Sequence, residues 1–365
     1  MINVTKSDLP DFEQYTQCLK EIWSNCWLTN NGRFVRLLED KLRTYLDAEG
    51  LILVSNGTLA IELALRVLEV EGEVITTPFT FPATTNSILW QRLTPVFADI
   101  DPETFNIDPA QVEKRITDRT SAILAVHVYG NPCYIDELQE IADKHDLALI
   151  YDAAHAFGVR YEDKSILNYG DISTLSFHAT KVFNTVEGGA IIVNNKELLE
   201  KVKLIRNHGI KSEEEVALPG TNAKMSELHA AAGLCNLATI DEKIQRRRAI
   251  CKYYKEKLAG LDIKFQKVIA SAYNYSYMPV CFEDNATRDA AFVELVKDGI
   301  KPRKYFHPLT TRYTCVEDGS PDPVEEYNLR CAFDVSQTVL CLPLYPDLNM
   351  KVVDDVADTL RGLIG

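Results

Sequence analysis

Residues 51–65 read Leu-Ile-Leu-Val-Ser-Asn-Gly-Thr-Leu-Ala-Ile-Glu-Leu-Ala-Leu, and this stretch decides the fold class. It begins with a short apolar run, passes through a turn at Gly57, and continues with apolar residues at helical spacing. A continuous apolar run of this length is typical of a strand that is covered on both faces. The stretch therefore predicts a strand followed directly by a helix, which is the repeating unit of α/β proteins.

The same alternation continues along the first two-thirds of the chain. Strands are predicted at Leu51–Ser55, Glu73–Thr77, Pro95–Asp99, Ala122–Tyr129, Ala148–Asp152, Ile172–His178 and Ala190–Asn194. Helices are predicted at Leu59–Leu68, Ile135–His145 and Glu197–Asn207. Alternating strands and helices predict a mostly parallel central sheet with helices on both faces.

A helical stretch over Met225–Leu258 separates this region from a C-terminal part with a different pattern. That part is predicted to contain strands at Tyr275–Phe282 and Thr338–Leu344 and helices at Asp289–Gly299 and Lys351–Leu363. We therefore expect a large domain over residues 1–240 and a smaller α+β domain over residues 241–365. The N-terminal helix is expected to be able to pack on the smaller domain.

The composition excludes several classes of function. A formal net charge of -14 argues against a nucleic-acid partner, because such proteins carry a basic face and the only basic run is Arg246–Arg248. Nine scattered cysteines, with no C-x-x-C pair, favour free thiols in a reducing cytoplasm and predict no metal site. The sequence also lacks a secretion signal at Met1–Pro10 and any apolar stretch long enough for a bilayer, so a cytoplasmic protein without a membrane segment is expected.

The turn at residues 55–58 has the features of a phosphate site. The first N–H groups of a helix are unpaired and lie at the positive end of its dipole. Gly57 permits close approach of a ligand, and Thr58 adds a hydroxyl group. The alternative is an ordinary strand–helix connection that is capped by Asn56 or Thr58.

A second candidate lies at the end of the strand that is predicted over residues 148–152. Asp152 would stand at the carboxyl edge of the sheet, where open α/β folds bind ligands. A carboxylate there can pair with a protonated ring nitrogen, and His155 is close enough in sequence to contact the same ring. The alternatives are a helix cap for Asp152 and a buried structural role for His155.

Lys181 is the third candidate. It follows an apolar strand that ends near Ser176 and precedes Glu187-Gly188-Gly189 and another strand. Lysine becomes a nucleophile when burial or nearby cations lower its pKa. The alternative is a surface lysine. A phosphate cradle, an acid and a lysine occur here in the order that fold-type-I pyridoxal-phosphate (PLP) enzymes use.

The chain resembles the DegT/DnrJ/StrS family of sugar aminotransferases from about residue 20 to its C-terminus. The motifs that carry the resemblance are Ser55–Ala60, Thr77–Thr84, His127–Pro132, Asp152–Gly158, Ser176–Lys181 and Gly220–Glu227. Because several independent motifs occur in the same order, the match is specific.

The resemblance implies a fold-type-I PLP transferase and a role for each motif. Lys181 would bind the cofactor covalently, and Asp152 would pair with the ring nitrogen; these two are the expected catalytic residues. Phe81 would stack on the ring. Gly57, Thr58 and Ser176 would bind the phosphate, and His155 would lie near the ring hydroxyl. Asn222 would reach the phosphate in a neighbouring subunit, so a homodimer with active sites at the subunit interface is implied.

Two positions depart from the usual family pattern. His155 stands where the family more often has glutamine, and Ala223-Lys224 stands where it more often has Tyr-Arg. Both variants resemble a subgroup that makes 4-amino-4,6-dideoxy sugars on dTDP. The resemblance therefore implies transfer of an amino group from L-glutamate to a dTDP-linked 4-keto-6-deoxy sugar, for lipopolysaccharide O-antigen or another surface glycan.

The nucleotide sugar would need cationic and polar contacts from the chain. Candidates for the diphosphate are Lys224, Arg206, Arg33 and the cluster Lys301–Lys304. Candidates for the sugar are His208, His307 and the segment Trp27–Gly32, with Asn31 chosen from it. Each of these residues is also compatible with a surface or structural role.

Three other functions stay open at this level. A 3-keto sugar aminotransferase of the same family is poorly separated by sequence. A PLP-dependent sugar dehydratase would carry histidine in place of Lys181. A catalytically inactive regulatory dimer should have lost Asp152, Lys181 or Ser176, and all three are present.

Overall fold

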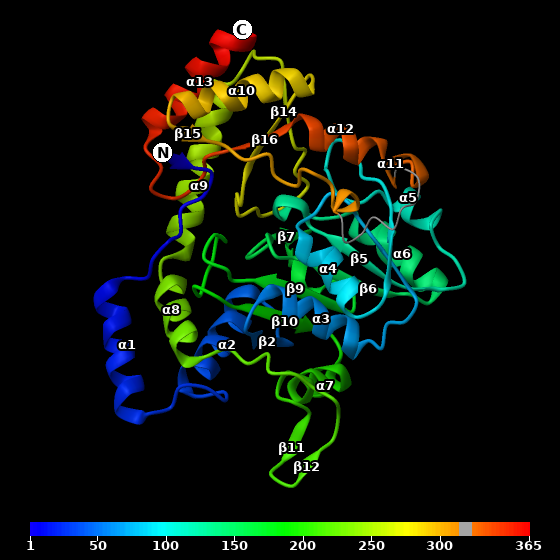
Figure 1. Cartoon of the computed structure of the whole chain (residues 1–365). Helices are drawn as coiled ribbons and strands as arrows, with labels where there is room; N and C mark the ends of the chain where they lie inside the picture. The colour runs from blue at the N-terminus through cyan, green and yellow to red at the C-terminus, as the bar shows by residue number, and fades with distance from the viewer. Residues whose placement is uncertain (314–322) are drawn as a thin grey trace.

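The computed structural model describes residues 1–313 and 323–365. Its centre is a seven-stranded sheet in the order β2-β10-β9-β6-β5-β3-β4 (Figure 1). Only β10 runs antiparallel to its neighbours in this sheet. The strands are β2 (Leu51–Val54), β3 (Glu73–Thr76), β4 (Thr94–Phe97), β5 (Thr120–Val126), β6 (Ala148–Asp152), β9 (Ile172–Ser176) and β10 (Gly189–Val193). The predicted α/β class with a mostly parallel sheet is confirmed.

Successive residues of each central strand face different cores. Leu53 and Ile75 lie in one cluster with α2 and α6, whereas Ile52 and Val74 lie in the other with α3 and α7. This alternation follows from the two-residue period of a strand and explains why the strands are apolar throughout. The flanking helices are α2 (Arg33–Leu46), α3 (Gly57–Val67), α4 (Pro82–Trp90), α5 (Pro109–Glu113), α6 (Ile135–His145) and α7 (Lys196–Arg206).

The long helix predicted over residues 225–258 is in fact two helices, α8 (Glu227–Leu237) and α9 (Ile240–Lys257). The break lies at Thr239, whose φ of -120° and ψ of 8° leave the helical region. The two helices form a column that leads from the sheet to the C-terminal part (Figure 1). The predicted boundary at residue 240 lies next to this break, and the division into two domains stays a prediction.

The C-terminal part has its own antiparallel sheet in the order β13-β14-β16. Residues from α9, α10, α13 and this sheet form a third buried cluster. The elements are β13 (Ile263–Phe265), β14 (Met278–Phe282), α10 (Asn285–Lys297), β15 (Ile300–Lys301), α11 (Pro323–Glu326), α12 (Arg330–Thr338), β16 (Val339–Leu342) and α13 (Met350–Ile364). Helix α10 begins four residues before its predicted start, because Asp284 caps it by accepting a hydrogen bond from the Thr287 N–H.

The N-terminal helix α1 (Phe12–Asn25) follows β1 (Ile2–Asn3), and its expected ability to pack on the smaller domain stays a prediction. The helix packs against α8, where the Tyr15 hydroxyl donates to the Leu228 carbonyl at 3.3 Å. Strand β1 reaches the C-terminal part, where it pairs with β15. The sequence does not predict this strand, because two residues are too few to show an alternating pattern. Its register with β15 is seen only in the tertiary structure.

The remaining elements are short. They are β7 (Arg160–Tyr161), β8 (Lys164–Ser165), β11 (Ile210–Ser212), β12 (Glu215–Val216) and the 3-10 turns Val128–Gly130, Ile166–Asn168 and Thr310–Arg312. The strand that was predicted over residues 122–129 ends at Val126 and is followed by the turn Val128–Gly130, in which Tyr129 adopts a φ of 58°. Across the described ranges 1–313 and 323–365, no helix combines the length and apolar character that crossing a bilayer requires.

Candidate active site

A cavity of about 300 Å³ lies at the carboxyl ends of β5, β6 and β9. The N-terminus of α3 forms one part of its wall, and residues 303–306 of the C-terminal part form another. Open α/β sheets bind ligands at the edge where the carboxyl ends of several strands meet. The lining includes Asn56, Gly57, Thr58, Thr80, Phe81, Asp152, His155, Ser176, His178, Thr180, Lys181, Glu187, Arg303, Tyr305 and Phe306.

Gly57 and Ser176 approach each other closely at the start of α3. Asn56 caps this helix by accepting a hydrogen bond from the Leu59 N–H at 2.8 Å, which confirms the cap at Asn56, while the phosphate site stays a prediction. A side chain at Gly57 would bring its Cβ within 2.8 Å of the Ser176 Cβ. The absence of that Cβ keeps the first turn of the helix open to the cavity, where its free N–H groups favour an anion.

Asp152 is the last residue of β6 and is only 5% exposed. Its carboxylate accepts hydrogen bonds from the Thr84 hydroxyl at 2.8 Å and from the Ala154 N–H at 3.0 Å. Burial raises the pKa of Asp152, and these two hydrogen bonds together with the charge of Lys181 oppose the rise. The group is therefore a carboxylate of raised proton affinity that faces the cavity.

Lys181 follows β9 in a turn in which its N–H donates to the His178 carbonyl at 2.9 Å. Burial lowers the pKa of the Lys181 amine to about 8 from its ordinary 10.5; Asp152 opposes this shift and Arg303 adds to it. A lowered pKa means that a larger fraction of the amine is neutral near pH 7, and the neutral amine is the nucleophile. The structure thus brings the predicted lysine and acid into one cavity.

His155 is buried against three aromatic side chains. Its ring centroid lies 4.9 Å from that of Tyr277 and 5.9 Å from those of Tyr305 and Phe306. Burial first, and then the charges of Lys181 and Arg303, lower the pKa of His155 well below its usual value, so the ring is neutral. Its Nδ1 atom is buried and has no hydrogen-bond partner. A buried unpaired nitrogen on a cavity wall indicates that a polar ligand group belongs beside it.

Phe81 stands at the mouth of the same cavity. It occupies the N-cap position of α4 and is 46% exposed, which is unusual for a phenylalanine that lines a pocket. An exposed aromatic ring at such a position offers a flat apolar face to a ligand ring.

Comparison with known proteins decides the family. The family model described as DegT/DnrJ/EryC1/StrS aminotransferase matches residues 11–361. The chain belongs to this aminotransferase family. The dTDP-4-amino-4,6-dideoxy-D-glucose transaminase of Shigella dysenteriae is 42% identical over 370 aligned positions, which cover 99% of both chains.

Solved structures agree with this assignment. A crystal structure of DesI in the presence of its TDP-sugar product is 34% identical, with a TM-score of 0.89 over 99% of this chain and 92% of that one. NtdA of Bacillus subtilis with bound cofactor PMP is 29% identical, with a TM-score of 0.87 over 96% of this chain and 81% of that one. Enzymes of this family depend on PLP, and the cofactor of this aminotransferase is therefore PLP.

The residues of the cavity fit this cofactor. The open first turn of α3 at Gly57 suits a phosphate, and the carboxylate of Asp152 suits a protonated ring nitrogen. The unpaired Nδ1 of His155 suits a polar substituent of the ring, and the amine of Lys181, with its lowered pKa, suits an aldehyde. Every polar group of the cofactor thus has a complementary group on the cavity wall.

The structure does not bring the predicted substrate residues of this aminotransferase into the cavity. Asn31, Lys224 and His307 lie outside its lining, as does the exposed Asn222 that was assigned to a neighbouring subunit. Contact of these four residues with a ligand stays a prediction. Burial, and then the charge of Arg206, lower the pKa of Lys224.

The structure corrects the interpretation of Arg206 as a diphosphate contact, because this side chain is not available to a ligand. It is buried, and its Nη1 atom donates to the Glu39 carboxylate at 3.0 Å and to the Leu53 carbonyl at 2.8 Å. Arg33 is also occupied, because it pairs with Glu21. A sequence shows that a residue is cationic, but it does not show whether a buried acid already neutralises it.

The sequence analysis missed the hydroxyls of Thr80 and Thr84 and the ring of Tyr305, whereas Arg303 was predicted as one member of the basic cluster Lys301–Lys304. Thr84 holds Asp152, and the Thr80 hydroxyl lies 2.8 Å from that of Thr84, so the two form a chain of hydroxyls. Their spacing of four residues inside a quoted motif was the available signal. Arg303 and Tyr305 come from the distant C-terminal part, and only Arg303 of the basic cluster lines the cavity.

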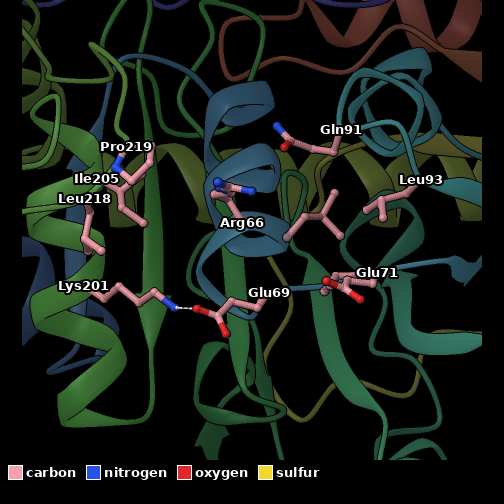
Figure 2. A pocket seen from close by; sticks show the side chains of 11 residues that line it. Arg66, Glu69, Glu71, Gln91, Leu93, Lys201, Ile205, Leu218 and Pro219 are labelled. Carbon is pink, nitrogen blue, oxygen red and sulfur yellow. Dashed lines mark hydrogen bonds and ion pairs between the residues drawn. The ribbon is translucent and has the colours of Figure 1, made fainter.

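A second cavity, of about 340 Å³, lies between α3 and α7 and also contains charged residues. In this α3–α7 cavity Lys201 points at Glu69, and the two form an ion pair at 2.6 Å (Figure 2). The Lys201 Nζ also donates to the Val67 carbonyl at 3.0 Å. The lysine is therefore fully engaged within the chain, which leaves no nucleophile for chemistry.

Proposed function

We propose that this enzyme transfers the amino group of L-glutamate to the keto carbon of a dTDP-linked 4-keto-6-deoxy sugar, giving a 4-amino-4,6-dideoxy sugar. One observation carries the proposal: Lys181, an amine whose pKa is lowered by burial to about 8, lines a cavity that also holds the buried acid Asp152. The choice of sugar is supported by the 42% identity to a transaminase of that description and by the likeness to a structure solved with a TDP-sugar product.

The residues would act as follows. When bound, PLP supplies an aldehyde carbon and a ring that withdraws electrons from the bond being broken. Asp152 would accept a hydrogen bond from the ring nitrogen and keep that nitrogen protonated. His155, which is neutral, would contact the ring without adding a charge.

Lys181 would move the protons in both halves of the reaction. Its Nζ would take the proton from Cα of glutamate in the first half. In the second half it would deliver a proton to the sugar carbon that receives the nitrogen. A positioned base of this kind is commonly worth about 100- to 10,000-fold in rate. Phe81 would cover one face of the ring and restrict the entry of water.

We further propose a homodimer in the cytoplasm. Asn222 is exposed and lies outside this chain's own cavity, so a role at the cofactor phosphate requires a neighbouring subunit. Eight cysteines of the described residues are free thiols, which fits a reducing compartment. Use of the product in lipopolysaccharide O-antigen synthesis is part of the same proposal.

In the test, the purified enzyme loaded with PLP is incubated with L-glutamate and one of two sugars. One sugar is dTDP-4-keto-6-deoxyglucose, and the other is the matching 3-keto sugar. We expect the 4-keto compound to be converted to a 4-amino sugar, identified by NMR, and the 3-keto compound to react far more slowly. Fast conversion of the 3-keto sugar would instead support the alternative aminotransferase. Turnover of neither sugar, alongside fast turnover of a simple keto acid, would rule the proposal out.

A further inference from the structure

Arg303 places a fixed positive charge on the wall of the active-site cavity. Its backbone N–H donates to the Cys341 carbonyl at 3.0 Å, and its carbonyl accepts from the Cys341 N–H at 2.8 Å. This pair of hydrogen bonds ties residue 303 to β16 and fixes where its side chain begins. The guanidinium carbon then lies 4.2 Å from the centroid of the Tyr305 ring, an aromatic contact that favours arginine.

No acid within residues 1–313 or 323–365 forms an ion pair with Arg303, although it is exposed to the cavity. Its neighbour Lys304, in contrast, pairs with Asp289. Of the acids that line the cavity, Asp152 is held by Thr84 and Ala154, and Glu187 lies 3.7 Å from His178. Arg303 is thus left as a guanidinium that is open to an anionic ligand.

The proposed reaction brings three kinds of anion to this cavity. The cofactor phosphate suits the first turn of α3 beside Gly57 and Ser176. Arg303 lies in a different wall, because its stacking partner Tyr305 contacts His155. The phosphate therefore leaves the guanidinium free.

The other two anions differ in their distance from the reacting atom. The α-carboxylate carbon of an amino acid is two bonds from the donor nitrogen, which would take the place of the Lys181 amine. The diphosphate of a nucleotide sugar is separated from the reacting C4 by the pyranose ring. Arg303, Lys181 and His155 line the same cavity, and the Tyr305 ring that the guanidinium contacts lies 5.9 Å from the His155 ring, centroid to centroid. This proximity favours the anion that must lie beside the reacting nitrogen.

We propose that Arg303 binds the α-carboxylate of the amino donor and so selects α-amino acids over simple amines. The inference rests on the proposed transamination and adds to it the residue that recognises the donor. The planar fork of the guanidinium matches a carboxylate through two parallel hydrogen bonds. Stacking on Tyr305 restricts the rotation of the guanidinium, so less conformational freedom is lost on binding.

The test compares Arg303→Met with Lys301→Met in the PLP-loaded full-length enzyme. Lys301 belongs to the same basic cluster and is exposed, but it lies outside the cavity, so it controls for loss of one surface charge. The half-reaction with L-glutamate alone is followed by the loss of the cofactor's visible absorbance. The same half-reaction is run with 4-aminobutanoate, which is glutamate without its α-carboxylate. Binding of the unreactive dicarboxylate glutarate is measured by calorimetry.

We expect Arg303→Met to weaken apparent binding of L-glutamate by about 10- to 100-fold, the usual effect of losing a charge-assisted contact. It should leave 4-aminobutanoate within about threefold, so the preference for glutamate falls by the same factor; glutarate should also bind more weakly. Lys301→Met should match the native enzyme in all three measurements.

Other results would overturn the inference. Unchanged glutamate binding in Arg303→Met, together with weaker binding of the nucleotide sugar, would assign the residue to the diphosphate. Equal loss for glutamate and 4-aminobutanoate would show that Arg303 acts only through the reactivity of Lys181. A native enzyme that does not react with L-glutamate would overturn it as well. Failure of the sugar proposal is a separate result, because the donor half-reaction contains no sugar.

Discussion

The active-site cavity and the α3–α7 cavity contain the same kinds of residue, a lysine, an acid and an arginine, but they differ in how these charges are arranged. In the α3–α7 cavity Lys201 lies 2.6 Å from Glu69, a glutamate that is largely exposed (Figure 2). In the active-site cavity Asp152 is held by Thr84 and Ala154 rather than by Lys181. The two cavities have similar volumes, about 340 and 300 Å³, so volume alone does not identify a site.

The difference shows what makes a lysine reactive. A direct ion pair in solvent stabilises the charged forms, and the hydrogen bond from Lys201 accordingly lowers the pKa of Glu69. Burial without a direct partner has the opposite effect: it lowers the pKa of Lys181 and raises that of Asp152. Reactivity in this enzyme therefore follows from buried charges that are close to each other but not paired.

The largest expected effect comes from substituting the lysine of each cavity in a separate variant. Lys181→Met should lower the transamination rate by about 100- to 10,000-fold or more, because both proton transfers and the covalent hold on the cofactor are lost. Lys201→Met should change the rate by less than about twofold, since it breaks only the pair with the exposed Glu69 and one hydrogen bond to the Val67 carbonyl, both outside the active-site cavity. Steady-state rates, with mass spectrometry after borohydride reduction, check both. A Lys181→Met enzyme with near-native activity would contradict the comparison.

Substitution of the acid should also lower the rate only in the active-site cavity, and the loss of rate should be somewhat smaller than for the lysine. Asp152→Asn should lower kcat by about 100- to 1,000-fold, the range found when one preorganised electrostatic group is removed. Glu69→Gln should leave kcat unchanged and should change the midpoint of urea unfolding little, because the pair is exposed to solvent. Steady-state kinetics measure kcat and urea unfolding measures the stability of both variants. If Asp152→Asn lost less than tenfold, the acid would not be holding the ring nitrogen.

The pH dependence of cofactor capture sharpens the comparison further. Only the neutral amine attacks an aldehyde, and the pKa of Lys181 is about 8. The rate at which cofactor-free enzyme binds PLP covalently should therefore rise by about 50-fold between pH 6 and pH 8, and by about a further twofold before it levels off at higher pH. Because Asp152 opposes the lowered pKa, Asp152→Asn should move the midpoint to lower pH. Stopped-flow absorbance reports the midpoint, and a value near 10.5 would show that burial does not activate the lysine.

The smallest expected effect concerns the phosphate cradle. Gly57→Ala places a Cβ 2.8 Å from that of Ser176 and should destabilise the fold by about 1–3 kcal/mol while weakening PLP binding about tenfold. Gly362 is the matched control: it lies in α13 with nothing within 4 Å of an added Cβ, so Gly362→Ala should stabilise by up to about 1 kcal/mol. Urea unfolding and PLP titration measure both variants. Recovery of stability in the double variant Gly57→Ala with Ser176→Gly would attribute the cost to this contact, and lack of recovery would argue against it.

The sequence by itself determined the fold class and the order of the three main candidates. Strand ends, glycine turns and helical spacing are local properties, and apolar runs covered on both faces identify a parallel sheet without coordinates. Since carboxyl ends of parallel strands meet at one edge, residues placed after such strands, as Asp152 and Lys181 are, had to lie near each other. The same reasoning found helix α6 with its observed bounds.

Only the tertiary structure decided which cations are free. Arg206 and Arg303 are the same residue type in the sequence. In the structure Arg206 is buried and paired with Glu39, whereas Arg303 is exposed on the cavity wall. The break at Thr239 and the pairing of Arg303 with Cys341 likewise depend on contacts between segments far apart in the chain. The physical reason is that burial and charge pairing are sums over neighbours in space. A sequence lists the groups that could pair, but the packing of the whole chain selects the ones that do.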